Sequence, residues 1–188
     1  MKTPHLTLAS LGLCLLLASC ASTKLPPKLS QAESERLKEL PLPYTVGVAR
    51  DNDSLYSDRL TKVLEQTGVF TKVAPLDSYK KAPDLIATVE EHVYGTSMIP
   101  VGYLLTFGVI PSIVEERHGE IFSLAPPKHW KKRVIVDASY KGSTTLGWAA
   151  PGVALSPDYC LKKPDQSKRF REMIAYRTLQ ALRPNKLP

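Results

Sequence analysis

An apolar leader that ends in a cysteine constrains this chain more than any other feature. Lys2 is the only charged residue of the leader, and leucines dominate the twelve residues from Leu6 to Leu17. A basic end followed by a short apolar core is typical of a secretory signal. The apolar run is too short for the ~20 residues that a membrane-spanning helix needs. We therefore expect the folded part of the chain to follow Cys20 and to lie outside the cytoplasm.

The residues at the end of the leader, Leu17-Ala18-Ser19-Cys20, resemble the lipobox of bacterial lipoproteins. The resemblance implies that residues 1–19 are a signal peptide, and that Cys20 carries diacylglycerol on its thiol and an acyl chain such as palmitate on its amine. Ala21 follows where an Asp would favour the inner membrane, which implies the periplasmic face of the outer membrane. An uncleaved anchor and a plain secreted protein are the alternatives for this leader.

Charge and cysteine content limit the partners of the mature chain. Only Lys2 leaves with the leader, so 24 basic and 18 acidic residues remain, a formal charge of +6. This modest excess favours lipid headgroups, lipopolysaccharide or acidic polymers, and together with export it argues against nucleic acid. Cys160 is the one cysteine left after cleavage and acylation, which excludes a disulfide scaffold. We expect its thiol to be buried, with an intermolecular bridge as the alternative.

The organisation predicted after the leader is a tether, one domain and a short tail. Residues 20–42 are the lipidated cysteine and a proline-rich tether, in which Ser30 and Glu33 fit the capping box of a short helix. Residues 43–184 form a single periplasmic α/β domain, and residues 185–188 are the tail. No glycine occurs in the tether, so we expect it to be stiff and to hold the domain away from the membrane.

The periodicity within the domain predicts a small mixed sheet with a β-α-β start, antiparallel strands and a C-terminal helix. Gly68 ends the first helix, Asp51-Asn52-Asp53 precedes it as a turn with an N-cap, and Asp165 caps the last helix. The predicted strands cover residues 44–49, 69–73, 84–94, 121–124, 134–140 and 144–149. Residues 115–120 are predicted as a solvated hairpin tip, 141–143 as a turn and 151–165 as a loop.

An uncharged apolar insertion, residues 96–114, interrupts the predicted sheet. Pro100 and Pro111 limit any unbroken helix within it to about ten residues, which is half the length needed to cross a bilayer. The insertion is either a loop that packs on the core or an exposed surface that docks on a partner or the membrane interface. In the second case Leu104, Leu105 and Phe107 are the candidate contact residues.

Two resemblances bear on the domain. The lipobox, the stretch Gly68-Val69-Phe70-Thr71-Lys72-Val73 and the segment from Leu105 to Pro111, LTFGVIP, resemble a group of small bacterial lipoproteins in which a TLG-I-P-like segment interrupts an α/β domain. More distantly, residues 44–94 are similar to the amino-terminal domains of TolB and of the curli secretion lipoprotein CsgG. Neither resemblance implies catalytic residues, a metal or a cofactor.

The residues do not form a recognisable catalytic or metal-binding motif. His92, His118 and His129 lack the spacing of a helical metal pair, and no nucleophile signature occurs. Trp130, Lys131, Lys132 and Arg133 combine cations with an aromatic ring, which suits an interaction surface as well as an ordinary solvated one.

We therefore expect a non-enzymatic accessory, assembly or binding factor of the envelope, held by membrane lipid through Cys20 and able to form oligomers. Its protein partner is not identified by the residues. The alternatives are a subunit of a CsgG-like oligomeric outer-membrane complex and a periplasmic hydrolase, whose His, Asp or Glu and Ser side chains would gather in a cleft.

Overall fold

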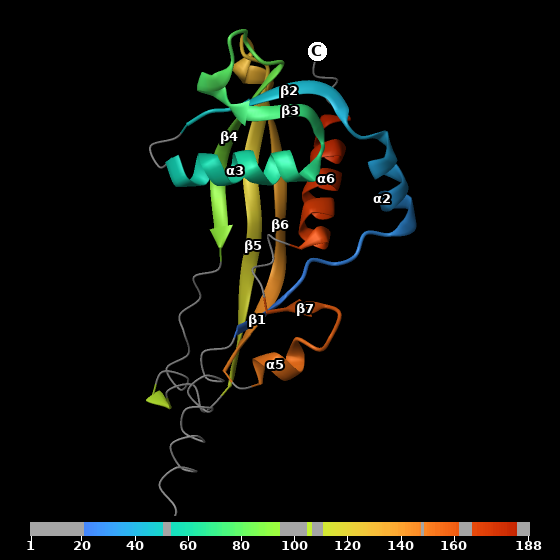
Figure 1. Ribbon diagram of the computed structural model, residues 1–188, viewed down its shortest axis with the longest axis vertical. Helices are drawn as coiled ribbons and strands as arrows, with labels where there is room; N and C mark the ends of the chain where they lie inside the picture. Colours follow the sequence, from blue (N-terminus) through green and yellow to red (C-terminus); the bar gives the residue numbers. More distant parts are fainter. Residues whose placement is uncertain are drawn as a thin grey trace, which may run out of the picture. The chain divides into compact units, whose positions relative to one another are not determined.

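The computed structural model describes residues 21–50, 54–94, 105–106, 111–147, 149–161 and 167–183. Within these ranges the chain forms seven strands, four α-helices and three short 3-10 helices (Figure 1). Their order is β1 (Ala21–Lys24), α2 (Gln31–Arg36), η1 (Leu37–Glu39), β2 (Leu42–Val48), α3 (Ser54–Thr67), β3 (Phe70–Pro75), η2 (Leu76–Ser78), β4 (Leu85–Tyr94), β5 (Ser112–Ala125), η3 (Trp130–Lys132), β6 (Val134–Leu146), α5 (Ala150–Val153), β7 (Tyr159–Cys160) and α6 (Lys168–Leu182).

The strands form one mixed sheet in the order β3-β2-β4-β5-β6-β1-β7. β2 is parallel to both of its neighbours, whereas β4 and β5 are antiparallel, as are β1 and each of its two neighbours. This sheet and the C-terminal helix confirm the predicted mixed α/β class.

Two compact units can be distinguished along the chain. Unit 1 comprises residues 1–26, 95–117 and 141–166, and unit 2 comprises residues 27–94, 118–140 and 167–188. Both β5 and β6 therefore contribute residues to each unit, and the predicted single-domain range of 43–184 includes parts of both.

The β-α-β start predicted for the domain is present in unit 2. β2 and β3 are parallel neighbours joined by α3, with Val46 opposite Val73. Gly68 ends the helix at φ +64°, a left-handed conformation that glycine adopts without steric cost. β2 is an interior strand between β3 and β4, and the side chains of Val46 and Val48 are buried on it.

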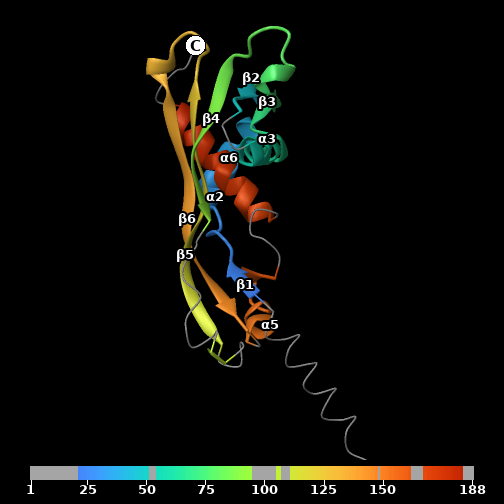
Figure 2. The same ribbon diagram turned by 90° about the vertical axis from the view of Figure 1, so that its left-hand side faces the viewer.

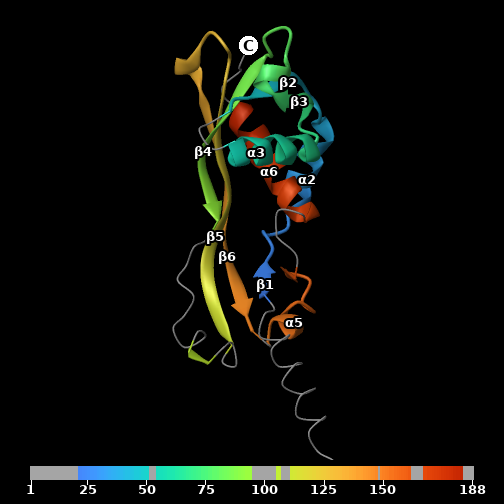
Figure 3. The same ribbon diagram turned by 60° about the vertical axis from the view of Figure 1, so that its left-hand side comes forward.

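The core of unit 2 lies between the sheet and two helices. Figures 2 and 3 show α3 and α6 on the same face of the unit 2 part of the sheet. Leu60 and Leu64 of α3 and Phe170 and Ile174 of α6 are almost fully buried there, together with Phe122 of β5. The strand predicted at residues 134–140 is present and is half-buried, because Val134, Val136, Ala138 and Tyr140 are buried and the residues between them are partly or fully exposed.

The predicted N-cap is confirmed for α2 and is wrong for α6. The capping box of Ser30 and Glu33 is present at α2, and hydrogen bonds from the backbone and side chain of Ser30 lower the pKa of Glu33. The N-cap of α6 is Ser167, whose hydroxyl accepts a hydrogen bond from Phe170 N at 3.1 Å. Asp165 is therefore not the cap, and both it and the predicted cap at residues 51–53 lie outside the described residues.

Three local predictions between residues 112 and 165 are wrong. Residues 115–120 are not a hairpin tip, because they lie within β5, in which residues 118–120 are buried. β6 continues through Lys141–Ser143 to Leu146, so no turn or separate hairpin strand forms there. The predicted loop at 151–165 contains most of α5 and all of β7.

Candidate functional site

The first described residues are part of the sheet rather than part of a tether. Ala21 pairs with Leu146 and Thr23 with Thr144 of β6, while Thr23 and Lys24 pair with β7 on the other side. Ser22 is fully buried between these strands. The tether predicted for residues 21–42 is thus wrong at its beginning, since the four residues after Cys20 are strand β1; Cys20 itself lies outside the described residues.

A polar network joins β1 to both of the strands that continue into unit 1. The Thr144 hydroxyl donates a hydrogen bond to Oε2 of Glu116 at 3.0 Å, and it lies 3.2 Å from the Thr23 hydroxyl. The Cys160 thiol donates to the Thr23 carbonyl at 3.6 Å. Cys160 is half-buried, not fully buried as the sequence predicts. These contacts support the two short pairings of β1, with β6 and with β7.

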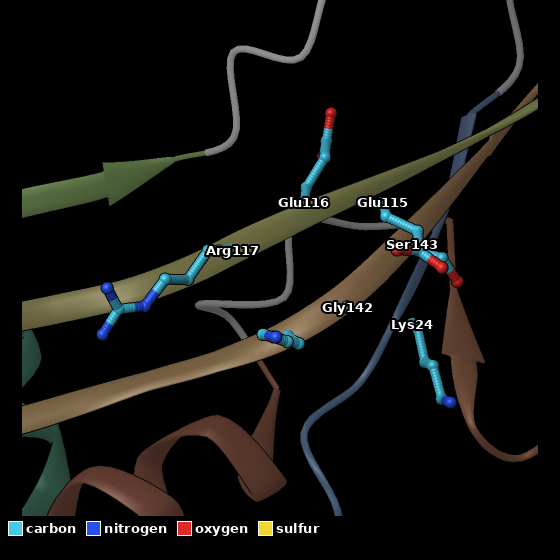
Figure 4. Close-up of a pocket in the computed structure, with 7 residues that line it drawn as sticks. Lys24, Glu115, Glu116, Arg117, Gly142 and Ser143 are labelled. Atoms are coloured by element: carbon cyan, nitrogen blue, oxygen red, sulfur yellow. The ribbon is translucent and has the colours of Figure 1, made fainter.

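A hollow of about 440 Å³ opens beside β1 in unit 1 (Figure 4). Seven residues line it: Lys24, Glu115, Glu116, Arg117, Lys141, Gly142 and Ser143. Glu116 and Lys24 point away from each other in Figure 4, so their charges do not meet at one point within the hollow. This arrangement suits a solvated polar surface better than the convergent groups that nucleophilic or acid–base catalysis requires.

The candidate residues of the apolar insertion are described only in part. Leu105 is strongly exposed, with 76% of its surface accessible, whereas Leu104 and Phe107 lie outside the described residues. Leu105, the one candidate that the structure describes, is therefore accessible to a partner.

The basic cluster predicted from the sequence forms an exposed tip between β5 and β6, which we call the basic tip and define as Trp130, Lys131, Lys132 and Arg133. Trp130 is 46% exposed, and the Arg133 guanidinium lies 6.0 Å from the centre of its ring. Arg133 also lies 3.6 Å from Glu90 of β4. The guanidinium and the ring are thus held together, while the two lysines extend into solvent.

Further cations lie at the same end of the unit 2 sheet. Ile86 at the start of β4 pairs with Ala125 at the end of β5, so the exposed Lys80 and Lys81 precede β4 at the end that carries the basic tip. The nearby Asp84 carboxylate binds Thr45 rather than one of these lysines. It accepts hydrogen bonds from the amide and the hydroxyl of Thr45, both at 2.8 Å, and these bonds lower the pKa of Asp84.

Unit 2 also contains a buried polar pair that the sequence does not indicate. Glu120 of β5 is 2% exposed, and its Oε1 lies 3.3 Å from Nε of Arg59 on α3. His118 is also buried on β5, and the centre of its ring lies 5.7 Å from the centre of the Tyr140 ring. The centres of the Tyr140 and Phe170 rings are 6.5 Å apart. The two-residue spacing of His118, Glu120 and Phe122 places all three on one face of β5. A sequence pattern that treats charged residues as exposed misses this face.

The three histidines of the mature chain belong to three different segments. His118 lies in β5, His129 is exposed at the start of η3, and the side chain of His92 on β4 lies outside the described residues. Among the residues that the structure describes, no group of three or more His, Cys, Asp or Glu side chains could hold a metal ion. No helix within the described ranges is both long enough and apolar enough to cross a membrane.

No protein-family model, curated protein or solved structure matches this chain.

Proposed function

We propose that this chain is a lipoprotein of the bacterial envelope, anchored by acylated Cys20 on the periplasmic face of the outer membrane, and that it acts by binding an acidic partner. The observation that carries the anchor is the position of β1. Ala21, which directly follows Cys20, pairs with Leu146 in the sheet, and this supports a mature chain that begins at Cys20.

The strength of such an anchor follows from the number of acyl chains. A single chain holds a protein only marginally, and each methylene buried in lipid contributes about 0.8 kcal/mol. Three chains on Cys20 would hold the protein permanently. Because β1 leaves no spacer, they would hold unit 1 at the membrane surface.

The basic tip supports the binding half of the proposal. Its exposed lysines and its partly exposed indole ring combine positive charge with an amphipathic contact surface. Lys80 and Lys81 extend the positive field at the same end of the unit 2 sheet. An acidic protein surface or an acidic polymer is the complementary partner.

The anchor is tested by metabolic labelling with palmitate. We expect the wild-type chain to incorporate the label and to fractionate with the outer membrane, and Cys20→Ser to lose the label, because serine cannot accept the thioether-linked diacylglycerol. Cys160→Ser is the matched control and is expected to retain the label. A labelled Cys20→Ser variant, or a wild-type chain without label, would contradict the anchor.

The acidic partner is tested on immobilised heparin as a model polyanion. We expect Lys131→Glu/Lys132→Glu to elute at a clearly lower salt concentration than wild type, since the clustered cations of the basic tip supply the contact. Lys28→Glu/Lys62→Glu changes two lysines elsewhere in unit 2 and gives the same net charge. Equal elution of the two double variants would show that net charge alone decides retention, and would exclude the basic tip as the binding surface.

A further inference from the structure

We infer that unit 1 docks on the membrane through an apolar rim, made of Leu105, Ile113, Leu155 and Leu161, whose side chains enter the lipid interface. The inference rests on the proposed acylation of Cys20, but it assigns a second membrane contact that lipidation does not require.

Exposure is concentrated in unit 1. The four rim side chains are 76%, 71%, 87% and 58% accessible, respectively. They are half of the eight large apolar residues that are exposed among the described residues, yet unit 1 contains only 35 of the 140 residues described. Single exposed leucines are ordinary on a protein surface, whereas a local concentration marks an interaction site.

Strand register places two of these residues beside the start of β1. Cys160 pairs with Thr23 in the antiparallel β1–β7 pair, so Leu161, the residue after β7, follows toward the Ala21 end of β1. On the other side of β1, the Thr144 hydroxyl of β6 donates a hydrogen bond to the Glu116 side chain of β5. From this contact β5 leads back to Ile113, and β6 leads on to Leu146. Because β5 and β6 are neighbours joined only by residues 126–133, too few for a parallel crossover, they are antiparallel, and Ile113 lies near Leu146, the partner of Ala21.

The third residue follows the short helix beside these strands. α5 packs against β1 and buries Ala150, and all three ribbon views place α5 beside the end of β6 that pairs with Ala21 (Figures 1 to 3). The Leu155 amide donates a hydrogen bond to the Gly152 carbonyl, which keeps Leu155 in the turn after the helix. Its side chain is the most exposed of the rim.

The position of the lipid decides which partner covers the rim. Consecutive Cα atoms are about 3.8 Å apart, so an acyl group on Cys20 begins within a few ångströms of Ala21. Ala21 is on the strand end where Ile113 and Leu161 lie. A bilayer that receives the acyl chains must therefore come close to the rim, and exposed aliphatic side chains gain free energy by entering its interface. A lipid surface is the occupant that this geometry favours over a soluble protein.

The rim is tested with the mature chain, residues 20–188, carrying Cys20→Ser so that no lipid is attached. This chain is mixed with vesicles of phosphatidylethanolamine and phosphatidylglycerol in a 3:1 ratio, and the bound fraction is measured by sedimentation. We expect Ile113→Ser/Leu155→Ser to reduce the partition coefficient at least tenfold. Leu55→Ser/Ile135→Ser removes one exposed leucine and one exposed isoleucine from unit 2, and is expected to stay within twofold of wild type.

Two further measurements distinguish vesicle binding by the rim from unfolding of a variant and from binding by the basic tip. Each variant must melt at the wild-type temperature, because all four substituted side chains are exposed. Binding that is supported by the rim persists in 0.5 M salt, whereas binding by the basic tip alone is lost there.

The inference is overturned if the mature chain that carries only Cys20→Ser does not bind vesicles, or if the rim variant binds as tightly as the unit 2 control. In either case palmitate labelling of the wild type still decides the anchor independently. If labelling fails while vesicle binding depends on Ile113 and Leu155, the anchor is wrong and the rim is supported.

Discussion

Replacing Gly119 with alanine is expected to destabilise the chain by about 3 kcal/mol or more, or to prevent folding. Gly119 has φ +141°, a conformation that side chains with a Cβ rarely adopt. A Cβ at this position would lie 2.3 Å from the Ala138 carbonyl oxygen and 2.5 Å from the Ser139 Cα. Both atoms are backbone, so β5 and β6 would have to separate to admit a methyl group.

Urea unfolding followed by circular dichroism measures this effect, and two other glycines serve as controls. Gly68 also has a positive φ, but a methyl group added to it would meet no atom within 4 Å, so alanine there tests conformation without overlap, with an expected loss of about 1 kcal/mol. Gly152 of α5 has neither feature, so its alanine variant is expected to be as stable as wild type. A Gly119→Ala variant no less stable than Gly68→Ala would exclude the backbone overlap as the cause.

Replacing Arg59 with methionine is expected to cost about 2–3 kcal/mol, somewhat less than the 3–5 kcal/mol typical of a fully buried pair. The Glu120 carboxylate is 2% exposed and would lose the guanidinium that lies 3.3 Å away. The expected loss is below the fully buried range because the Arg59 side chain is itself 25% exposed. Since α3 carries Arg59 and β5 carries Glu120, the loss would also weaken the attachment of the helix to the sheet.

A double-mutant cycle identifies the pair as the source of this loss. Arg59→Met/Glu120→Met replaces both charges by apolar side chains, and we expect it to recover much of the stability that Arg59→Met loses. Arg50 and Asp77 form the matched surface pair, with side chains 60% and 61% exposed, so Arg50→Met is expected to cost at most about 0.5 kcal/mol. Additive losses in the cycle would show that Arg59 and Glu120 do not stabilise each other.

Hydrophobic periodicity in the sequence correctly predicts the elements whose partners are close along the chain. β2, α3 and β3 follow one another and pack together, and Gly68 ends the helix at the predicted position. The capping box at Ser30 needs only a residue three positions away. The buried stripe of α6 and the alternation of β6 are likewise local patterns, each repeated over enough residues to be clear.

Of the two candidate surfaces, the sequence predicts the one whose residues are neighbours along the chain and misses the other. The exposed basic tip is visible in the sequence because four neighbouring residues form it, and connections between strands run over the protein surface. The apolar rim is not visible, because its four residues are spread from position 105 to position 161 and each of them alone is an ordinary aliphatic residue.

By itself, the sequence determined the mixed α/β class, the β-α-β start and the two principal helices, because short-range periodicity encodes which face of each element is buried. Only the tertiary structure decided that Ala21–Lys24 is a strand, since its partners lie more than 100 residues further along the chain. It also decided that Glu120 is buried, since an arginine on a distant helix makes that burial possible. Long-range pairing and the desolvation of charged groups depend on neighbours that meet only in the folded chain, and no local pattern records them.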